Sequence, residues 1–222
     1  WGWSSLAVSL PGHAGSPEQR PMIDCTLDYY LGFVRAEIQR LPTPPIYLGH
    51  SMGGALGQWY LKYVGDDLPA MVLAAPWVSH NAFWDGMQLF QRLVPEAVKE
   101  CLQTGLGTPL TSTPERAAKV LLSVNSLITP VELHAQLGPE SGLVTFQHAP
   151  PFWFPPRQIK TPLLWIAAEK DACISLPAAR RSARFYRAEY LEVKDAAHNL
   201  MMEASYADTA RIIHEWLVKK VS

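Results

Sequence analysis

The sequence predicts an α/β fold, a mostly parallel sheet flanked by helices, with a helical segment inserted into it. Three observations carry this prediction. Apolar runs of strand length alternate with helical patterns near both ends of the chain, this alternation stops between residues 77 and 156, and a glycine-flanked serine separates one apolar run from the helix that follows. With 222 residues and 48% hydrophobic content, the chain can bury a sizeable core as one domain.

The first part of the chain reads as alternating strands and helices. Residues 6–10 form a short apolar run that ends in a turn-rich loop, and we expect a strand there. Between residues 24 and 41 apolar side chains recur on one helical face, and a proline-rich turn ends that helix. Strands are then expected at 46–48 and 71–75, with a helix over 55–61 between them.

The middle of the chain interrupts this order. Residues 77–156 contain several short helical patterns separated by Gly, Pro and Thr, which we interpret as a helical lid. The α/β core is then made of residues 1–76 and 157–222. Its remaining expected elements are a strand at 163–168, a helix at 177–186, a strand at 190–193 and a closing amphipathic helix at 206–219.

Composition excludes several classes of partner. The net charge of −1 and the absence of a long basic run argue against nucleic acid, and no run of 18 apolar residues indicates an integral membrane segment. The three cysteines are odd in number and never form a C-x-x-C pair, so we expect core thiols in a reducing compartment and no zinc site. The first residues lack the features of a signal peptide, and we expect a cytoplasmic protein.

Ser51 is the candidate nucleophile. It stands in Gly49-His50-Ser51-Met52-Gly53, which satisfies the G-x-S-x-G pattern between an apolar strand and a helix. In this pattern a strained turn projects the serine hydroxyl out of the sheet, and small neighbours let the helix pack closely. The alternative is a glycine-rich turn that carries no chemistry.

A serine hydroxyl requires a histidine to take its proton and a carboxylate to hold the imidazole. In the chain order Ser, acid, His, the acid belongs after the strand at 163–168 and the histidine after the last strand. Asp171 is the predicted acid, with Glu169 as the alternative, and His198 is the predicted base. The other six histidines are interpreted as structural or solvated, with His50 buried beside the nucleophile. No metal ligand motif is present, and no metal or other cofactor is expected.

These motifs together resemble the α/β-hydrolase superfamily, in its lid-bearing serine esterase and lipase-like branch. The resemblance covers nearly all of the chain, in order: the loop at residues 10–16, the nucleophile turn at 49–54, the acid loop at 169–174 and the histidine loop at 197–199. Ser9 and Ala14 stand where the family often has Asp and Gly. The resemblance implies ester hydrolysis through an acyl-enzyme, with the backbone N–H of Met52 as one oxyanion donor.

One part of the family pattern has no match. The family's third strand and the His-Gly loop after it, which provides the second oxyanion donor, are not found in this sequence. In the family this strand lies between the strand expected at 6–10 and the nucleophile strand, and its loss would leave a gap in the sheet. We therefore expect an upstream polypeptide segment, from a longer chain or a separate one, to carry the missing strands.

The predicted lid is rich in aromatic residues and poor in charge, which favours an apolar pocket above Ser51 and a small-molecule ester with an apolar acyl or aryl group. The candidate substrate-binding residues are Trp77, Phe83, Trp84, Phe152 and Trp153. The alternative is that most of these rings form the core of the lid itself. A C–C bond hydrolase, thioesterase or amidase on the same triad, or a non-catalytic ligand receptor, also stays open, because the fold does not fix the scissile bond.

Overall fold

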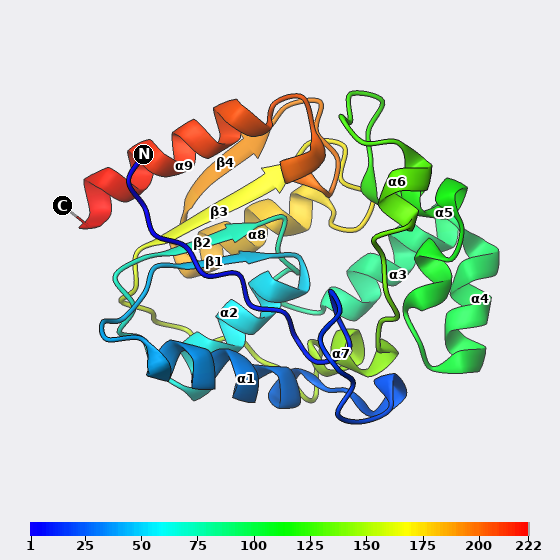
Figure 1. Ribbon diagram of the computed structural model, residues 1–222, viewed down its shortest axis with the longest axis horizontal. Coiled ribbons are helices and arrows are strands. Elements are labelled where there is room, and N and C mark those ends of the chain that lie inside the picture. Colours follow the sequence, from blue (N-terminus) through cyan, green and yellow to red (C-terminus); the bar gives the residue numbers. More distant parts are fainter. Residues whose placement is uncertain (222) are drawn as a thin grey trace.

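The centre of the protein is a four-stranded parallel sheet, seen in a computed structural model that describes residues 1–221 (Figure 1). Neighbouring strands follow the order β1-β2-β3-β4, and each pair is parallel. The predicted fold class, a parallel sheet flanked by helices, is confirmed. The strands are β1 (Tyr47–His50), β2 (Met71–Ala74), β3 (Leu163–Ala168) and β4 (Glu189–Val193).

Helices connect the strands because a parallel pair needs a long crossover. In the helix that precedes β1, buried Leu27, Tyr30, Leu31 and Val34 follow the spacing of one helical face. The helices of the sheet layers are α1 (Leu27–Arg40), α2 (Met52–Tyr63), α8 (Leu176–Tyr186) and α9 (Tyr206–Val221), with the 3₁₀ turns η1 (Met22–Asp24) and η3 (Leu200–Met202).

The two faces of the sheet bury alternate residues of the same strands. Leu73 and Trp165 pack in one cluster with side chains of α1, α2 and α8. Val72 and Ile166 point the other way and pack against Trp216 of α9. This alternation follows from the two-residue period of a strand, and it places β2 and β3 at the centre of the core.

The chain between β2 and β3 forms further helices, drawn in green at the right of Figure 1. They are α3 (Ala82–Leu93), α4 (Pro95–Thr104), η2 (Thr108–Thr111), α5 (Pro114–Leu121), α6 (Pro130–His134) and α7 (Gly142–Gln147). We call residues 77–156 the insertion; its role as a lid and its boundaries remain predictions. A third buried cluster joins α3, α4 and α5 to the end of β3 and the start of α8, and includes Val120 and Cys173.

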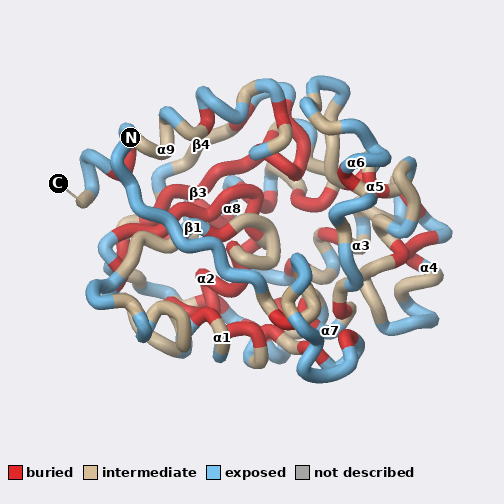
Figure 2. The backbone as a smooth tube through the Cα atoms, in the orientation of Figure 1, coloured by how far each residue is buried: buried red, intermediate tan, exposed pale blue. Residues whose placement is uncertain are grey.

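The prediction of a strand at residues 6–10 is wrong. These residues form no ladder with any described residue, and Leu6 and Val8 are 61% and 44% exposed. An apolar run becomes a strand only when a neighbouring strand takes up its backbone hydrogen bonds, and this segment has no such neighbour in the described chain. Figure 2 shows residues 1–9 as an exposed tube across the buried sheet.

The N-terminal segment is attached to α9 by aromatic contacts. The ring of Trp1 stacks on His214 with centroids 4.9 Å apart, and Trp3 Nε1 donates to His214 Nδ1 at 2.9 Å. Among the described residues β1 pairs only with β2, so its other edge is open. In residues 1–221 no helix combines the length and the apolar character needed to cross a membrane.

Candidate active site

Ser51 lies in the sharp turn between β1 and α2. Its backbone has φ 51° and ψ −116°, a strained conformation for a residue with a side chain. The turn is held on both sides, because Ser51 N–H donates to the carbonyl of Ala74 at 3.1 Å and the Ser51 carbonyl accepts from Gly54 N–H at 2.9 Å. The turn therefore fixes the hydroxyl at the carboxyl end of the sheet.

The glycines around Ser51 differ in whether a side chain would fit in their place. A Cβ on Gly49 would lie 2.6 Å from the carbonyl carbon of Gly53, and one on Gly54 would lie 2.9 Å from Cα of Pro76. A Cβ on Gly53 would meet no atom within 4 Å. The close approach of α2 thus depends on Gly49 and Gly54, and the second glycine of the G-x-S-x-G pattern is not required for space.

Ser51, His198 and Asp171 form one hydrogen-bonded chain. Ser51 Oγ lies 2.8 Å from His198 Nε2, and His198 Nδ1 lies 3.0 and 2.9 Å from the two oxygens of Asp171. The His198 and Asp171 side chains are 3% and 2% exposed. Because the carboxylate accepts the hydrogen of Nδ1, Nε2 is left to accept the serine proton.

The loop after β3 orients Asp171. Its Oδ1 accepts the backbone N–H of Cys173 at 2.7 Å and that of Ile174 at 3.0 Å. Glu169, the alternative acid, binds Lys194 Nζ at 3.1 Å and the backbone N–H of Asp195 at 2.9 Å. Of the two acids, the structure therefore brings Asp171 to His198.

The charges around His198 raise its affinity for a proton. Burial alone lowers the pKa of His198, but the charge of Asp171, with contributions from Cys173 and from hydrogen bonds, outweighs it and raises this pKa well above 6.5. Burial, and then the charge of His198, lowers the pKa of His50 to about 4. His50 is therefore neutral at pH 7.

Met52 begins α2, directly after Ser51. The first N–H groups of a helix have no carbonyl partner within the helix, and they lie at the positive end of its dipole. The backbone N–H of Met52 is thus a donor beside the serine hydroxyl. This arrangement suits an oxyanion.

The five aromatic residues proposed from the sequence fall into two groups. Trp153 is buried, and its ring stacks on that of Trp59 with the centroids 5.5 Å apart. Trp77 is partly buried and packs against the core cluster that contains these two rings. Phe83 contacts Trp84 and Phe146 edge-on. The ring of Phe146 in turn contacts Phe152, and Trp84, Phe146 and Phe152 are exposed.

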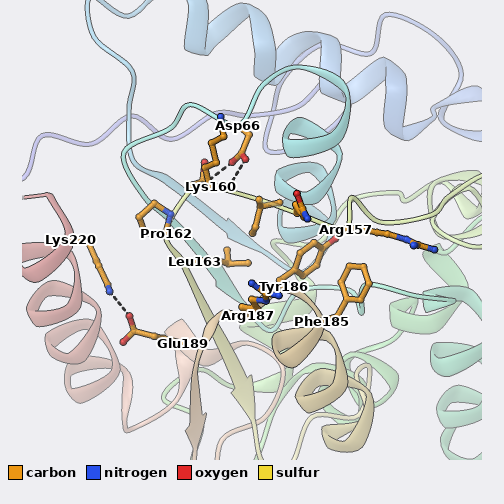
Figure 3. A pocket seen from close by; sticks show the side chains of 13 residues that line it. Asp66, Arg157, Lys160, Pro162, Leu163, Phe185, Tyr186, Arg187, Glu189 and Lys220 are labelled. Atoms are coloured by element: carbon orange, nitrogen blue, oxygen red, sulfur yellow. Dashed lines mark hydrogen bonds and ion pairs between the residues drawn. The ribbon is translucent and has the colours of Figure 1, made fainter.

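Two cavities lie away from the triad. The larger, of about 670 Å³, is at the amino ends of β3 and β4, and Figure 3 shows Asp66, Tyr186 and Glu189 around it. The smaller, of about 320 Å³, lies between α8 and the chain that follows β2. Neither is lined by Ser51, Asp171 or His198.

The sequence indicated no more than a structural role for Cys173 and His148. The ligand atoms of Asp171, Cys173 and His198 all lie within 4.8 Å of one another, and this trio has the donor atoms to bind a metal ion. The position of Cys173, two residues after the acid, was the available signal. His148 is fully buried, accepts from Trp59 Nε1 at 3.0 Å and donates to the Val78 carbonyl at 3.1 Å.

The chain is similar to known hydrolases in sequence pattern and in fold. A sequence model described as the alpha/beta hydrolase family matches residues 2–212. No curated protein matches the chain. A monoacylglycerol lipase of Paleococcus ferrophilus is 18% identical, with a TM-score of 0.62 over 95% of this chain and 81% of that one.

Two esterases have the same fold. The thermophilic esterase of Thermogutta terrifontis is 17% identical, with a TM-score of 0.62 over 96% of this chain and 79% of that one. The esterase of Exiguobacterium antarcticum is 14% identical, with a TM-score of 0.69 over 94% of this chain and 79% of that one. At such identities the likeness establishes the fold and leaves the substrate open.

Proposed function

The chain belongs to the alpha/beta hydrolase family, and we propose on this basis that it is a serine hydrolase of carboxylic esters with an apolar acyl or aryl group. The observation that carries the proposal is the 2.8 Å hydrogen bond between Ser51 Oγ and His198 Nε2, with Asp171 behind the imidazole. This is the arrangement that activates a serine for acyl transfer.

The first half of the proposed reaction forms an acyl-enzyme. His198 Nε2 takes the proton of Ser51 as Oγ attacks the ester carbonyl, and Asp171 stabilises the imidazolium. The Met52 N–H donates to the negative oxygen of the tetrahedral intermediate. The intermediate collapses when His198 returns the proton to the leaving alcohol, which leaves the acyl group on Ser51.

The second half releases the acid. A water molecule gives its proton to His198 Nε2 while its oxygen attacks the acyl carbonyl, and the second tetrahedral intermediate then expels Ser51 Oγ, which regains a proton from His198. The strained turn supports this cycle because it holds Oγ beside the imidazole at no cost of reorganisation during the reaction.

The apolar substrate class rests on the insertion. Its rings at Phe83, Trp84, Phe146 and Phe152 contact one another, and three of them are exposed. Trp153 instead packs on Trp59 of the core, so we propose it as a docking residue of the insertion. The rings that the insertion leaves exposed are the ones we propose to contact substrate, together with Trp77.

Labelling with a fluorophosphonate probe tests the nucleophile. We expect stoichiometric labelling of the wild-type chain at Ser51, no labelling of Ser51→Ala, and normal labelling of Ser5→Ala, whose serine is exposed and outside the triad. An unlabelled wild-type chain of intact fold would instead favour a non-catalytic receptor. A series of p-nitrophenyl esters, with matched thioesters and anilides, then separates esterase from thioesterase and amidase.

The open edge of β1 supports a second proposal, on a partner. Tyr47 N–H donates to the Ala70 carbonyl just before β2, and Ser51 N–H donates to the Ala74 carbonyl of β2, at 3.1 Å each. By alternation the N–H groups of Leu48 and His50 point to the other edge. We propose that a further polypeptide segment pairs there and brings the second oxyanion donor.

Hydrogen exchange tests this pairing. In a polypeptide that carries the segment, the amides of Leu48 and His50 should exchange as slowly as those of Tyr47 and Ser51. In the 222-residue chain alone, only the latter two should be slow. Fast exchange of Leu48 and His50 in every longer polypeptide would contradict the proposal.

A further inference from the structure

Cys173 lies directly against the acid and base of the candidate triad. The thiol is buried with 8% of the residue exposed, and its Sγ donates to the carbonyl of Val120 in α5 at 3.4 Å. The backbone N–H of the same residue binds Asp171 Oδ1 at 2.7 Å, which fixes the position of the thiol relative to the carboxylate.

The three side chains supply a matched set of metal donors. A thiolate, an imidazole nitrogen and a carboxylate oxygen are the ligands that Zn²⁺ takes in proteins, at about 2.0–2.3 Å from the ion. Neighbouring ligands of a tetrahedral ion are then about 3.5 Å apart by geometry. The donor atoms of Asp171, Cys173 and His198 lie within 4.8 Å of one another, so shifts of about 1 Å or less bring them to that spacing.

We propose that Asp171, Cys173 and His198 form an inhibitory site for a thiophilic divalent cation of the Zn²⁺ type. The ion binds the Cys173 thiolate, His198 Nδ1 and an Asp171 oxygen, and water fills the fourth position. Binding of the ion does not depend on the proposed function, whereas its inhibitory effect rests on it.

The inhibition follows from the tautomer of His198. In the free site the neutral ring carries its hydrogen on Nδ1, where Asp171 accepts it. When the ion takes the Nδ1 lone pair, that hydrogen moves to Nε2, and the Cys173 thiol releases one proton to solvent. Nε2 then donates and no longer accepts from Ser51, so the base is lost.

The burial of the site determines the kinetics. Val120, whose carbonyl accepts the Cys173 thiol, is itself 2% exposed and belongs to the same buried cluster. Because the donor side chains are buried, an ion reaches them only when this packing opens locally. We expect slow-onset inhibition that EDTA reverses, in contrast to the rapid effect of an ion at the surface.

Cd²⁺ spectroscopy tests the binding without catalysis. In the Ser51→Ala variant, Cd²⁺ should produce an ultraviolet thiolate-to-metal charge-transfer band, and adding Cys173→Ala should abolish it. The matched control is Ser51→Ala with Cys101→Ala, which removes a half-buried thiol elsewhere and should keep the band. A band that survives Cys173→Ala, or no band in Ser51→Ala, overturns the site.

Zn²⁺ titration of ester hydrolysis tests the inhibition. Loss of a direct ligand should cost at least as much as loss of an outer-shell partner, so Cys173→Ala should raise the half-inhibitory Zn²⁺ concentration more than about tenfold, and Cys173→Ser gives a second, more conservative variant. Equal Zn²⁺ sensitivity of the wild type and both folded variants contradicts the proposal. A chain that shows the Cd²⁺ band but hydrolyses no ester refutes the proposed function alone.

Discussion

The side chain of His50 holds the backbone of His198. Its Nε2 donates to the His198 carbonyl oxygen at 2.9 Å, and the two rings lie with centroids 4.9 Å apart. The residue before the candidate nucleophile thus fixes the loop that carries the candidate base. The hydrogen bond itself raises the pKa of His50, but burial and the charge of His198 outweigh it and lower that pKa to about 4, so the neutral ring donates from Nε2 at pH 7.

Acid should destabilise the protein through its buried histidines. Burial lowers the pKa of His50 to about 4 and that of His148 to about 3, from 6.5. As pH falls from about 6.5 to 4, both protonate in the unfolded chain and stay neutral in the fold, so the free energy of unfolding falls by up to about 2.7 kcal/mol per pH unit. His198, whose pKa is raised, is protonated in both states below about pH 5.5 and adds nothing to the slope there.

Urea unfolding between pH 4.5 and 6.5 measures this slope. His148→Gln should remove about half of it. A wild-type slope that stays near zero across this range would show that the two buried rings titrate normally.

The activity of the enzyme should rise with pH through the titration of His198. Only the neutral ring accepts the Ser51 proton, and Asp171 raises the pKa of His198 well above 6.5 against the effect of burial. The acid limb of kcat/KM should therefore have its midpoint above pH 6.5, and any residual activity of Asp171→Asn should have a lower midpoint. An acid limb centred below pH 6 in the wild type would contradict this.

Asp171 and Glu169 should differ sharply in their effect on catalysis. Asp171→Asn removes the negative charge and places an amide that can hold the imidazole in the wrong tautomer, so we expect kcat to fall by on the order of 10⁴. Glu169→Gln breaks an exposed contact with Lys194 and should change kcat less than about threefold, because exposed ion pairs contribute little. The reverse ranking would make Glu169 the acid.

The glycines after Ser51 give a matched pair of variants. Gly54→Ala forces a Cβ against Pro76 and should cost about 1–3 kcal/mol of stability, with a loss of activity as the turn shifts. Gly53→Ala meets open space in a helix and should be neutral or stabilise by about 0.5–1 kcal/mol. Thermal unfolding and ester hydrolysis of both variants measure the contrast; equal damage would mean that the turn needs glycine for another reason.

The sequence predicted the periodic elements well because their patterns are local. The runs at residues 163–168 and 71–75 are almost the strands β3 and β2, which are apolar throughout, as strands buried on both faces must be. Residues 6–10 have similar local character but no neighbouring strand, and pairing is a tertiary property that no window of sequence contains.

The candidate site was less accessible to sequence reasoning. The order of motifs places Ser51, the acid loop and His198 at one end of the sheet, but it left Asp171 and Glu169 as alternatives. The distinction comes from the direction of two side chains two residues apart, which the backbone N–H groups of Cys173 and Ile174 decide. The contact of Cys173 with this site depends on the same loop geometry.

The position of the insertion has a consequence for how the chain folds. Met71 of β2 is the sheet partner of Leu163 of β3, yet all of the insertion separates them. The Leu27 N–H also donates a hydrogen bond to Gln147 Oε1, which lies 120 residues later in the chain. Closing such loops costs entropy before the contacts repay it, so the central pairing forms slowly. During synthesis the apolar edge of β2 stays unpaired until β3, more than ninety residues later, has been made. In that interval chaperone binding or aggregation competes with the native pairing for this edge.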